Sequence, residues 1–351
     1  MKFKLALVAG MLLLCLTGCA PTIAPNACIR SGVPTGSMAY GAFIPRLANG
    51  TILTTPAEMV TEARALHASV IRAEQDVTAP VAAERKTFDD AGLQTLLTIR
   101  NNPQPSAAGK PTVFPPHTPE DLATFKTNLN ASLRANPPCL VAVENEEVGS
   151  PFVSGSASDY VAELKATIDV AHPLGIPVTN GGIVSGVSAL LTWQDLSQHA
   201  GKPAADDFAR RAFVKPTQKK LLASLLSSPD GTLPPGPHAD NLGKANQLIA
   251  AYKALPLDYV NFHWYIDDDQ ALTQTVNYLK RATGHPAITH EIGQYNVDPA
   301  IVTGHLQTLA RLGTPMVIWF DADGDPAFGL HDAPGVLRPN GYAYRTQATA
   351  A

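Results

Sequence analysis

Eight short apolar, β-prone segments alternate with helix-like segments along most of this 351-residue chain, and this alternation restricts the possible folds more than any other feature. Such a repeat is typical of a parallel sheet with helices packed around it. Eight repeats are what a (β/α)8 barrel requires, so we predict an α/β fold, a single-domain TIM barrel over residues 35–351. The predicted strands are Ser37–Phe43, Ser69–Glu74, Leu93–Ile99, Cys139–Val143, Pro177–Thr179, Asp258–Trp264, Ala287–His290 and Met316–Phe320.

Helix-like segments follow most of these strands. After the fifth strand, a long insertion, Ile183–Leu255, contains at least two more helices, and connections of this length commonly form part of a binding cleft. A doubly wound open sheet is the alternative, but no strand is followed by a G-x-G-x-x-G or P-loop pattern. The predicted helices are Pro56–Leu66, Ala82–Ala91, Glu120–Asn136, Asp159–Ala171, Thr217–Leu226, Leu242–Ala254, Ala271–Thr283 and Pro299–Leu312.

The first 19 residues have the composition of an export signal. A basic start, Met1–Lys4, precedes an apolar run, Leu5–Leu16, that is too short to span a bilayer. The run ends in Leu-Thr-Gly-Cys and resembles a bacterial lipoprotein signal over residues 1–18. This resemblance implies cleavage before Cys19, lipidation of Cys19, a tether over residues 19–34, and a lipid-anchored protein of the cell envelope. An ordinary signal peptide with a chance cysteine is the alternative.

Charge and cysteine content narrow the possible partners. The net charge of −4 gives no electrostatic reason to expect binding to nucleic acid. Cys28 and Cys139 remain once the signal is removed and Cys19 carries lipid. Export to an oxidising compartment permits a disulfide between them, and two isolated buried thiols are the alternative.

Acidic residues stand where two of the predicted strands end. Leu140–Val143 runs into Glu144-Asn145-Glu146-Glu147, and Ala287–His290 runs into Glu291. Barrel enzymes place their chemistry at the carboxyl ends of the strands, so these acids are candidates for one active site. Two carboxylates facing each other across a barrel mouth can hydrolyse a glycosidic bond.

The order of these residues resembles the retaining (β/α)8 glycoside hydrolases of clan A, which include cellulases, mannanases and xylanases. By this resemblance Glu146 is the general acid/base and Glu291 the nucleophile, with the two carboxyls about 5 Å apart. Arg72, which closes the second strand, and Tyr265 would keep Glu291 ionised. The resemblance also implies substrate or support roles for three further residues: Asn145 toward a sugar 2-hydroxyl, His263 at the end of the sixth strand, and Trp319 as a platform for a sugar ring.

Several alternatives stay open. Glu144, Glu146 and Glu147 compete for the acid/base role, and regular strand alternation puts Glu144 and Glu146 on the same side; the family's Asn-Glu order favours Glu146. Trp319 is otherwise a core residue. We expect no metal, because no H-E-x-x-H or tight His/Cys spacing occurs, and no cofactor. The expected partner is a poly- or oligosaccharide bound by a monomer, and a non-catalytic carbohydrate-binding lipoprotein is the rival function.

Overall fold

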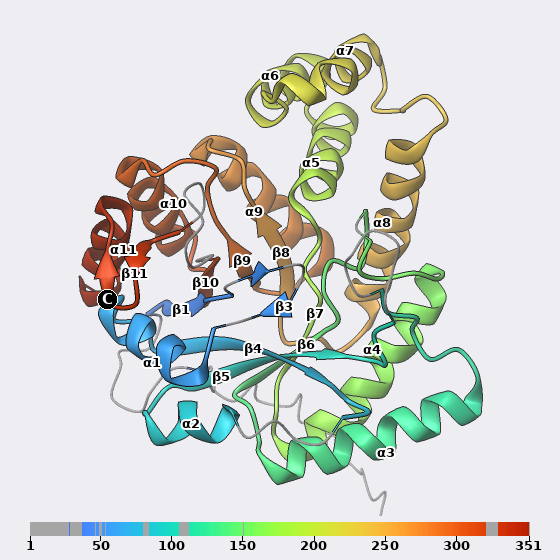
Figure 1. Ribbon diagram of the computed structural model, residues 1–351. Coiled ribbons are helices and arrows are strands. Elements are labelled where there is room, and N and C mark those ends of the chain that lie inside the picture. The colour runs from blue at the N-terminus through green and yellow to red at the C-terminus, as the bar shows by residue number, and fades with distance from the viewer. Residues whose placement is uncertain are drawn as a thin grey trace, which may run out of the picture.

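The structure is a computed structural model that describes residue 28 and residues 37–45, 47–48, 51–52, 54–79, 84–104, 112–149, 151–320 and 329–350 (Figure 1). Eight strands form one parallel sheet in the order β7-β6-β5-β4-β1-β10-β9-β8. The strands are β1 (Ala39–Phe43), β4 (Val70–Asp76), β5 (Gln94–Arg100), β6 (Leu140–Val143), β7 (Val178–Asn180), β8 (Val260–Trp264), β9 (Ala287–Ile292) and β10 (Met316–Phe320).

The two ends of this sheet, β7 and β8, meet and close it. Two isolated parallel bridges join them, Thr179 to Tyr259 and Ile183 to Phe262. Between these bridges the side chains of Asn180 and Asn261 take the place of a backbone ladder. Asn180 Nδ2 donates to the Asn261 carbonyl at 2.8 Å, and the Asn261 backbone N–H donates to Asn180 Oδ1 at 2.7 Å. The sheet is therefore a barrel, and the predicted single-domain (β/α)8 fold is confirmed.

Helices surround the barrel, and their ends follow local sequence signals. Thr55 caps α1 with a capping box to Glu58, and Pro56 occupies the first turn. Outside the insertion the helices are α1 (Pro56–Ala65), α2 (Glu84–Asp90), α3 (Pro119–Ala135), α4 (Ala157–Ala171), α9 (Asp269–Thr283), α10 (Pro299–Arg311) and α11 (Pro339–Ala350). The short antiparallel pairs β2 (Leu47–Ala48) with β3 (Thr51–Ile52) and β11 (His331–Ala333) with β12 (Val336–Leu337) complete the strands of the described residues.

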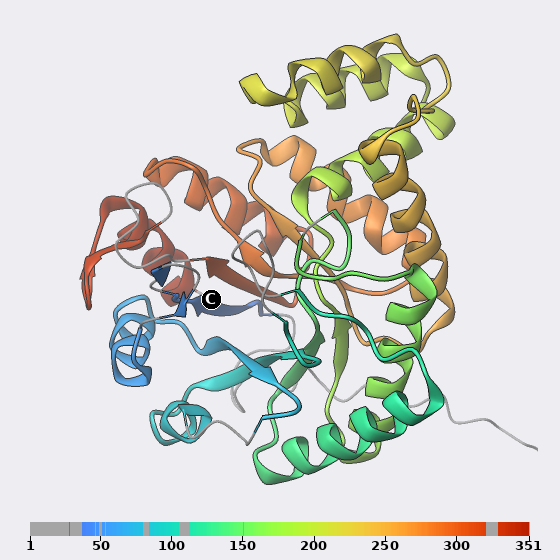
Figure 2. The same cartoon turned by 45° about the vertical axis from the view of Figure 1, so that its right-hand side comes forward.

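The insertion after β7 consists mainly of four helices. It contains α5 (Ser185–His199), α6 (Lys202–Ala212), α7 (Lys219–Ser227) and α8 (Pro237–Ala254), with short 3-10 turns at His172–Leu174 before it and Pro216–Gln218 within it. Both ribbon views show α6 and α7 projecting beyond the ring of helices that surrounds the barrel (Figure 2). Of the two segments predicted here, Thr217–Leu226 corresponds to α7 and Leu242–Ala254 to most of α8, while α5 and α6 were not specified.

The apolar core has two layers, separated by the barrel wall. A small cluster fills the inside of the barrel at the amino ends of the strands and includes Val70, Leu140 and Ile288. A much larger cluster lies between the outer face of the strands and the helices. Because alternate residues of a strand point to opposite faces, each strand supplies both layers. At the carboxyl ends many inward-facing positions are polar, with Phe43 and Phe320 as apolar exceptions, and this end of the barrel holds the site.

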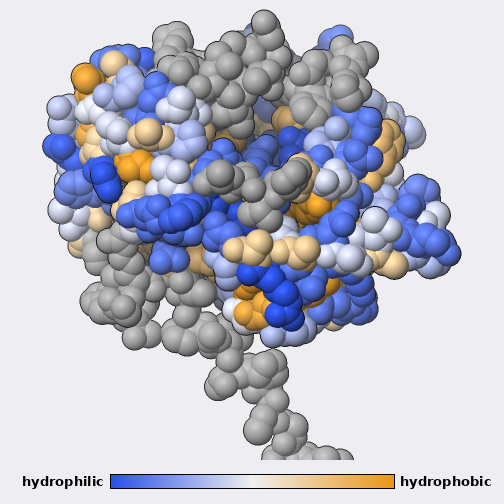
Figure 3. Space-filling model, turned by 60° about the horizontal axis from the view of Figure 1, so that its bottom comes forward, coloured by the Kyte–Doolittle hydropathy of each residue, from blue (hydrophilic) through white to orange (hydrophobic). Residues whose placement is uncertain are grey.

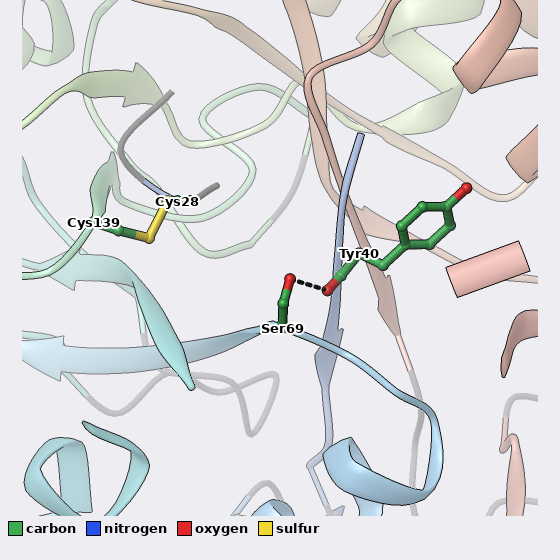
Figure 4. Close-up of a disulfide and its surroundings, with 4 residues drawn as sticks. All are labelled: Cys28, Tyr40, Ser69 and Cys139. Atoms are coloured by element: carbon green, nitrogen blue, oxygen red, sulfur yellow. Dashed lines mark hydrogen bonds between the residues drawn. A yellow bond between two sulfur atoms is a disulfide. The ribbon is translucent and has the colours of Figure 1, made fainter. Parts of the chain in front are cut away.

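A disulfide joins Cys28 to Cys139, with an S–S distance of 2.04 Å (Figure 4). This resolves the alternative left open by the sequence. Both cysteines belong to the inner apolar cluster, and Cys139 directly precedes β6. Nearby, Ser69 Oγ donates to the Tyr40 carbonyl at 3.2 Å and links the starts of β4 and β1. The disulfide therefore fixes Cys28 to the floor of the barrel, opposite the mouth.

On the face seen in Figure 3, hydrophilic residues predominate and hydrophobic ones form small separate areas. Within the described ranges, no helix is both long and apolar enough to cross a bilayer. The expected signal and Cys19 lie outside the described residues, so these remain predictions.

Candidate active site

Arg72 is the central residue of the barrel mouth. Its side chain is buried, and each of its nitrogens donates to an acceptor: Nε to Thr98, Nη1 to Glu291 at 2.7 Å, and Nη2 to Asn145 at 2.7 Å and Glu74 at 3.1 Å. Nη1 also bonds the backbone carbonyl of the residue before Glu291. The guanidinium can donate five hydrogen bonds, and five acceptors surround it. Such a fully paired cation holds β4, β6 and β9 in fixed relation.

The position of Arg72 differs from the one predicted. It lies in the middle of β4, which continues to Asp76 because Gln75 and Asp76 still pair with Ile99 and Arg100 of β5. The longer strand brings Glu74 into the site on the same inward face as Arg72. Glu74 accepts hydrogen bonds from both arginines, at 3.1 Å from Arg72 and 3.4 Å from Arg100.

Glu291 has both carboxylate oxygens engaged. Oε2 pairs with Arg72, and Oε1 accepts a hydrogen bond from the Tyr265 hydroxyl at 2.9 Å, the contact expected from the sequence. Burial, together with the charge of Glu291, raises the pKa of the Tyr265 hydroxyl well above its usual range, so the phenol keeps the proton that it donates. The ion pair and the hydrogen bond fix the orientation of Glu291 and compensate its charge.

An irregularity in β9 directs Glu291 into the barrel. Ile288 pairs with Asn261 and Glu291 pairs with His263, so three steps along β9 match two steps along β8. A bulge of this kind adds a residue and changes which side chains face inward. As a result, His290 and Glu291 both face the barrel interior although they are adjacent.

Glu146 lies across the mouth from Glu291. His263 Nδ1 is 3.1 Å from Glu146 Oε1 and 3.6 Å from Glu291 Oε1, so the imidazole stands between the two acids. One carboxylate oxygen of Glu146 and one of Glu291 lie within 4.8 Å of each other. Both side chains are only partly buried, at 14% and 12% exposure, and a ligand in the mouth can reach them.

The side chains of the three competing acids after β6 lie in different environments. The strand ends at Val143, and Glu144 and Glu146 both have left-handed backbone conformations, with φ of 64° and 50°. Regular alternation therefore does not continue past the strand, and Glu144 and Glu146 do not share a side. Glu144 is buried and accepts from the Asn101 N–H at 2.7 Å. Glu147 is buried and accepts from Asn180 and Tyr252, so Glu146 alone faces the mouth.

Asn145 lies in the same turn and is oriented by Arg72. Its Oδ1 accepts the guanidinium hydrogen bond, and within the described residues its Nδ2 group makes no hydrogen bond. Since Oδ1 is occupied, Nδ2 is the atom with which Asn145 can donate to a ligand. The expectation that Asn145 contacts a sugar hydroxyl therefore requires Nδ2 as the donor.

Trp319 does not reach the mouth, so the predicted sugar platform is wrong. Its side chain is fully buried in the outer apolar layer and packs edge-on against Tyr344 of α11, with 6.2 Å between ring centroids. The next residue, Phe320, faces inward, against the rings of Phe43 and Tyr265 at 5.8 and 6.1 Å. Alternation along β10 places one aromatic ring inside and its neighbour outside.

Two residues of the site were not predicted as members. Glu74 was included only as the end of a strand, although a carboxylate two residues from an arginine is a signal of a shared face. His290 was considered only as part of a metal motif. It bonds His263 within the barrel, with 3.1 Å between His290 Nδ1 and His263 Nε2. Its inward direction depends on the β9 bulge, for which the sequence offered no signal.

The spacing of Glu146, His263 and Glu291 is also compatible with a shared cation. The neighbours of Glu291 favour another use, because Arg72 already supplies a positive charge at 2.7 Å from one oxygen and Tyr265 donates to the other. Chemically, the arrangement offers one charge-compensated carboxylate and one carboxyl group bonded to an imidazole. Such a pair suits nucleophilic attack and proton transfer.

Fold and site together define a (β/α)8 barrel with paired carboxylates at its carboxyl mouth. No protein-family model matches the sequence, and no curated protein does. Among solved structures, an endo-β-1,4-mannanase from Thermotoga petrophila is similar, with a TM-score of 0.50, 10% identity, and coverage of 89% of this chain and 76% of that one.

Two endo-β-1,3-glucanases of family GH128 are also similar. The enzyme from Amycolatopsis mediterranei, a variant in complex with laminaripentaose, has a TM-score of 0.48, 11% identity and coverage of 88% and 99% of the two chains. The enzyme from Sorangium cellulosum has a TM-score of 0.48, 14% identity and coverage of 88% and 98%. At these identities the likeness concerns the fold alone.

Proposed function

We propose that this chain is a retaining glycoside hydrolase that cleaves a β-linked poly- or oligosaccharide, with Glu291 as nucleophile and Glu146 as general acid/base. The observation that carries the proposal is the separation of the two carboxylates, within 4.8 Å between oxygens across the barrel mouth. Retaining glycosidases hold their carboxyl groups about 5 Å apart, whereas inverting enzymes need about 6.5 Å or more to admit a water.

In the first step, Glu291 attacks the anomeric carbon, and Glu146 delivers its proton to the departing glycosidic oxygen. Arg72 and Tyr265 hold the attacking carboxylate in one orientation, so little reorganisation is needed at the moment of attack. Asn145 Nδ2, oriented through Oδ1 by Arg72, donates to a hydroxyl of the bound sugar. A covalent glycosyl–enzyme ester on Glu291 results.

In the second step, Glu146 acts as a base. It takes a proton from a water molecule, the water oxygen attacks the same anomeric carbon, and the bond to Glu291 breaks. The sugar leaves with its original configuration, and Glu146 is protonated again. His263 Nδ1 lies 3.1 Å from Glu146 Oε1, and this contact holds the carboxyl group in one orientation in both steps.

We also propose that the enzyme is a lipid-anchored protein of the cell envelope, attached through Cys19. The lipoprotein-like start of the sequence supports this, and the Cys28–Cys139 disulfide suits an oxidising compartment. Because Cys28 is fixed to the barrel floor, an anchor nine residues earlier leaves the mouth on the far side from the membrane. Mass spectrometry of the mature N-terminus tests the anchor directly.

The test of activity is reducing-end release by the purified full chain on β-glucans, mannans, xylans and bacterial exopolysaccharides. Glu291→Gln and Glu146→Gln are compared with Glu120→Gln, an exposed acid on α3. We expect Glu291→Gln to abolish release and Glu120→Gln to leave it unchanged. On an aryl glycoside whose leaving group needs no proton, azide should restore turnover to Glu146→Gln, because azide attacks the glycosyl–enzyme ester without the help of a base and is released as a glycosyl azide. Proton NMR of the first-formed product gives its anomeric configuration.

An inverted product would exclude the retaining mechanism, and release that persists in Glu291→Gln would exclude this nucleophile. The rival function is carbohydrate binding without turnover. If no polymer releases reducing ends but one of them binds measurably, the result would favour that rival.

A further inference from the structure

A linear chain of hydrogen bonds runs from Glu146 into the barrel. His263 Nδ1 lies 3.1 Å from Glu146 Oε1, and His263 Nε2 lies 3.1 Å from His290 Nδ1. Both imidazoles are fully buried, and their ring centroids are 4.9 Å apart. Gly182 makes this packing possible, because a Cβ at that position would lie 2.3 Å from His263 Nε2 and 3.0 Å from His290 Cε1.

Proton counting distinguishes the possible tautomers. If His290 Nδ1–H donates to His263 Nε2, then His263 carries its proton on Nδ1 and donates to Glu146. The remaining nitrogen, His290 Nε2, is then a bare lone pair, and it is buried with no partner among the described residues. In the reverse arrangement that nitrogen carries an unpaired buried N–H, which costs about 1–3 kcal/mol. Only the first arrangement avoids a stranded donor.

Charged groups around the chain favour the same arrangement. Glu146 and Glu291 both face His263 Nδ1, and two negative groups favour a proton there. Glu147 is also close enough to interact electrostatically with His263. On the far side, Arg72 bonds the His290 carbonyl. Burial, with the positive charge of Arg72, holds the pKa of His290 well below its usual range, so His290 is neutral.

The amide of Asn261 fixes the backbone of this arrangement. Its Oδ1 accepts from the His290 N–H at 3.0 Å, and its backbone N–H and Nδ2 both bond Asn180 of β7. The β9 bulge that directs His290 inward is therefore tied to the seam that closes the barrel. Glu147 supports the same arrangement, because Asn180 Nδ2 also donates to Glu147 Oε1 at 2.8 Å.

We infer that His290 is a positioning residue that holds His263 neutral, with its Nδ1–H directed at Glu146. The inference rests on the proposed function for its role in the reaction. Because His290 Nδ1–H occupies His263 Nε2, a second proton cannot enter His263 without turning His290 around and stranding its N–H. His263 then supplies a hydrogen bond to Glu146 without becoming a cation.

A neutral His263 matters because Glu146 must be protonated before the first step. A cationic His263 in contact with Glu146 would lower the pKa of the carboxyl, typically by one unit or more for an opposite charge at this distance. The fraction of enzyme with protonated Glu146 would then be smaller at moderately acidic pH. We therefore expect His290 to affect kcat and its pH dependence and to leave KM unchanged.

The first test does not depend on activity. In the full chain labelled with 15N at histidine, long-range proton–nitrogen spectra distinguish protonated from bare imidazole nitrogens. His263, assigned by comparison with His263→Gln, should show a protonated Nδ1 and a bare Nε2 from pH 5 to 8. In His290→Ala, a water fills the vacated space and can accept from Nε2, so His263 should take up a second proton in this range. In His290→Asn, whose amide can donate from about the same place as Nδ1, the wild-type pattern should return.

The second test is the pH profile of kcat/KM. His290→Ala should move its basic limb to lower pH by about one unit, and His290→Asn should leave it in place. A wild-type His263 that is protonated on Nε2, or a His263 titration that is the same in wild type and His290→Ala, would overturn the inference. If His290→Ala does not fold, the wild-type and His290→Asn spectra still decide.

The two proposals fail separately. A wild-type protein with the expected tautomer and no hydrolysis of any polymer would refute the proposed function alone. An active enzyme with the opposite tautomer would refute only the role of His290.

Discussion

A buried carboxyl pair behind the mouth should make the stability of this protein fall as the pH rises. Glu144, just after β6, and Glu163 on α4 are both fully buried and interact electrostatically, so the two carboxyl groups share an environment without solvent. Burial raises the pKa of Glu144 from 4.5 to about 7, and the Asn101 N–H opposes this shift only in part. Glu163 has its pKa raised in the same direction.

The sign follows from proton linkage. Between pH 4.5 and about 7 the native protein keeps a proton on Glu144 that the unfolded chain has lost. The native state therefore binds more protons, and the free energy of unfolding falls as the pH rises through this window. For Glu144 the loss amounts to about 3 kcal/mol across the window. His290, whose pKa is lowered by burial, contributes a slope of the opposite sign below its unfolded pKa.

The difference between wild type and Glu144→Gln removes the contribution of His290, which is present in both proteins, and reports the ionisation of the Glu144–Glu163 pair. Glutamine keeps the shape of the protonated acid and cannot ionise. Urea unfolding at intervals from pH 4.5 to 7.5 should show Glu144→Gln gaining about 3 kcal/mol relative to wild type by pH 7. Glu120→Gln, a change at an exposed position, should run parallel to wild type at all pH values.

A difference curve that is flat across this window would mean that Glu144 titrates as it does in the unfolded chain. A difference curve that falls as the pH rises would mean that the native state favours the ionised form of Glu144. Either result would refute the account of Glu144 as a carboxyl whose burial outweighs its hydrogen bonds.

Three further outcomes follow from other contacts. Tyr265→Phe removes one hydrogen bond to the proposed nucleophile and should lower kcat about 10- to 100-fold, with the melting temperature nearly unchanged. Replacing Cys28 and Cys139 together by alanine opens a loop of 111 residues and should lower the free energy of unfolding in urea by about 3–4 kcal/mol, an effect that dithiothreitol should reproduce in the wild type. Gly182 has a φ of 95° and lies against His263, so Gly182→Ala should lower the free energy of unfolding in urea by more than about 1 kcal/mol. Gly243→Ala, whose new methyl group meets open space, should not lower it.

Sequence reasoning assigned His263 and Tyr265 to the site, and the structure brings both side chains there. Along β8, Phe262 and Trp264 lie in the outer apolar layer, while His263 points into the barrel and Tyr265, just beyond the strand, reaches Glu291. Each strand is covered by helices on one side and by the barrel interior on the other, so apolar and polar positions alternate cleanly near the mouth. The fold could be predicted for the same reason, since its eight repeats are visible in the chain.

Sequence reasoning failed where the backbone departs from regular pairing. The bulge in β9 lets His290 and Glu291 face the same way, and a bulge depends on pairing with both neighbours rather than on local residue type. Trp319 was assigned inward by resemblance, while Phe320 occupies that face. In the insertion, α5 was not specified because about half of its residues, including Trp193, are buried, which weakens the amphipathic period that marks a surface helix.

The turn after β6 shows how three acids within four residues produce one candidate catalytic group. Left-handed backbone at two non-glycine residues, Glu144 and Glu146, costs about 1–2 kcal/mol each. Glu144 is bonded by the Asn101 N–H, Glu147 by Asn180 and Tyr252, and the Glu146 N–H by the carbonyl of Gly181. These bonds offset the strain and hold the turn from both sides. Glu144 and Glu147 thus act as anchors that fix the direction of Glu146, and this explains why a cluster that looks redundant in sequence has one member facing the mouth.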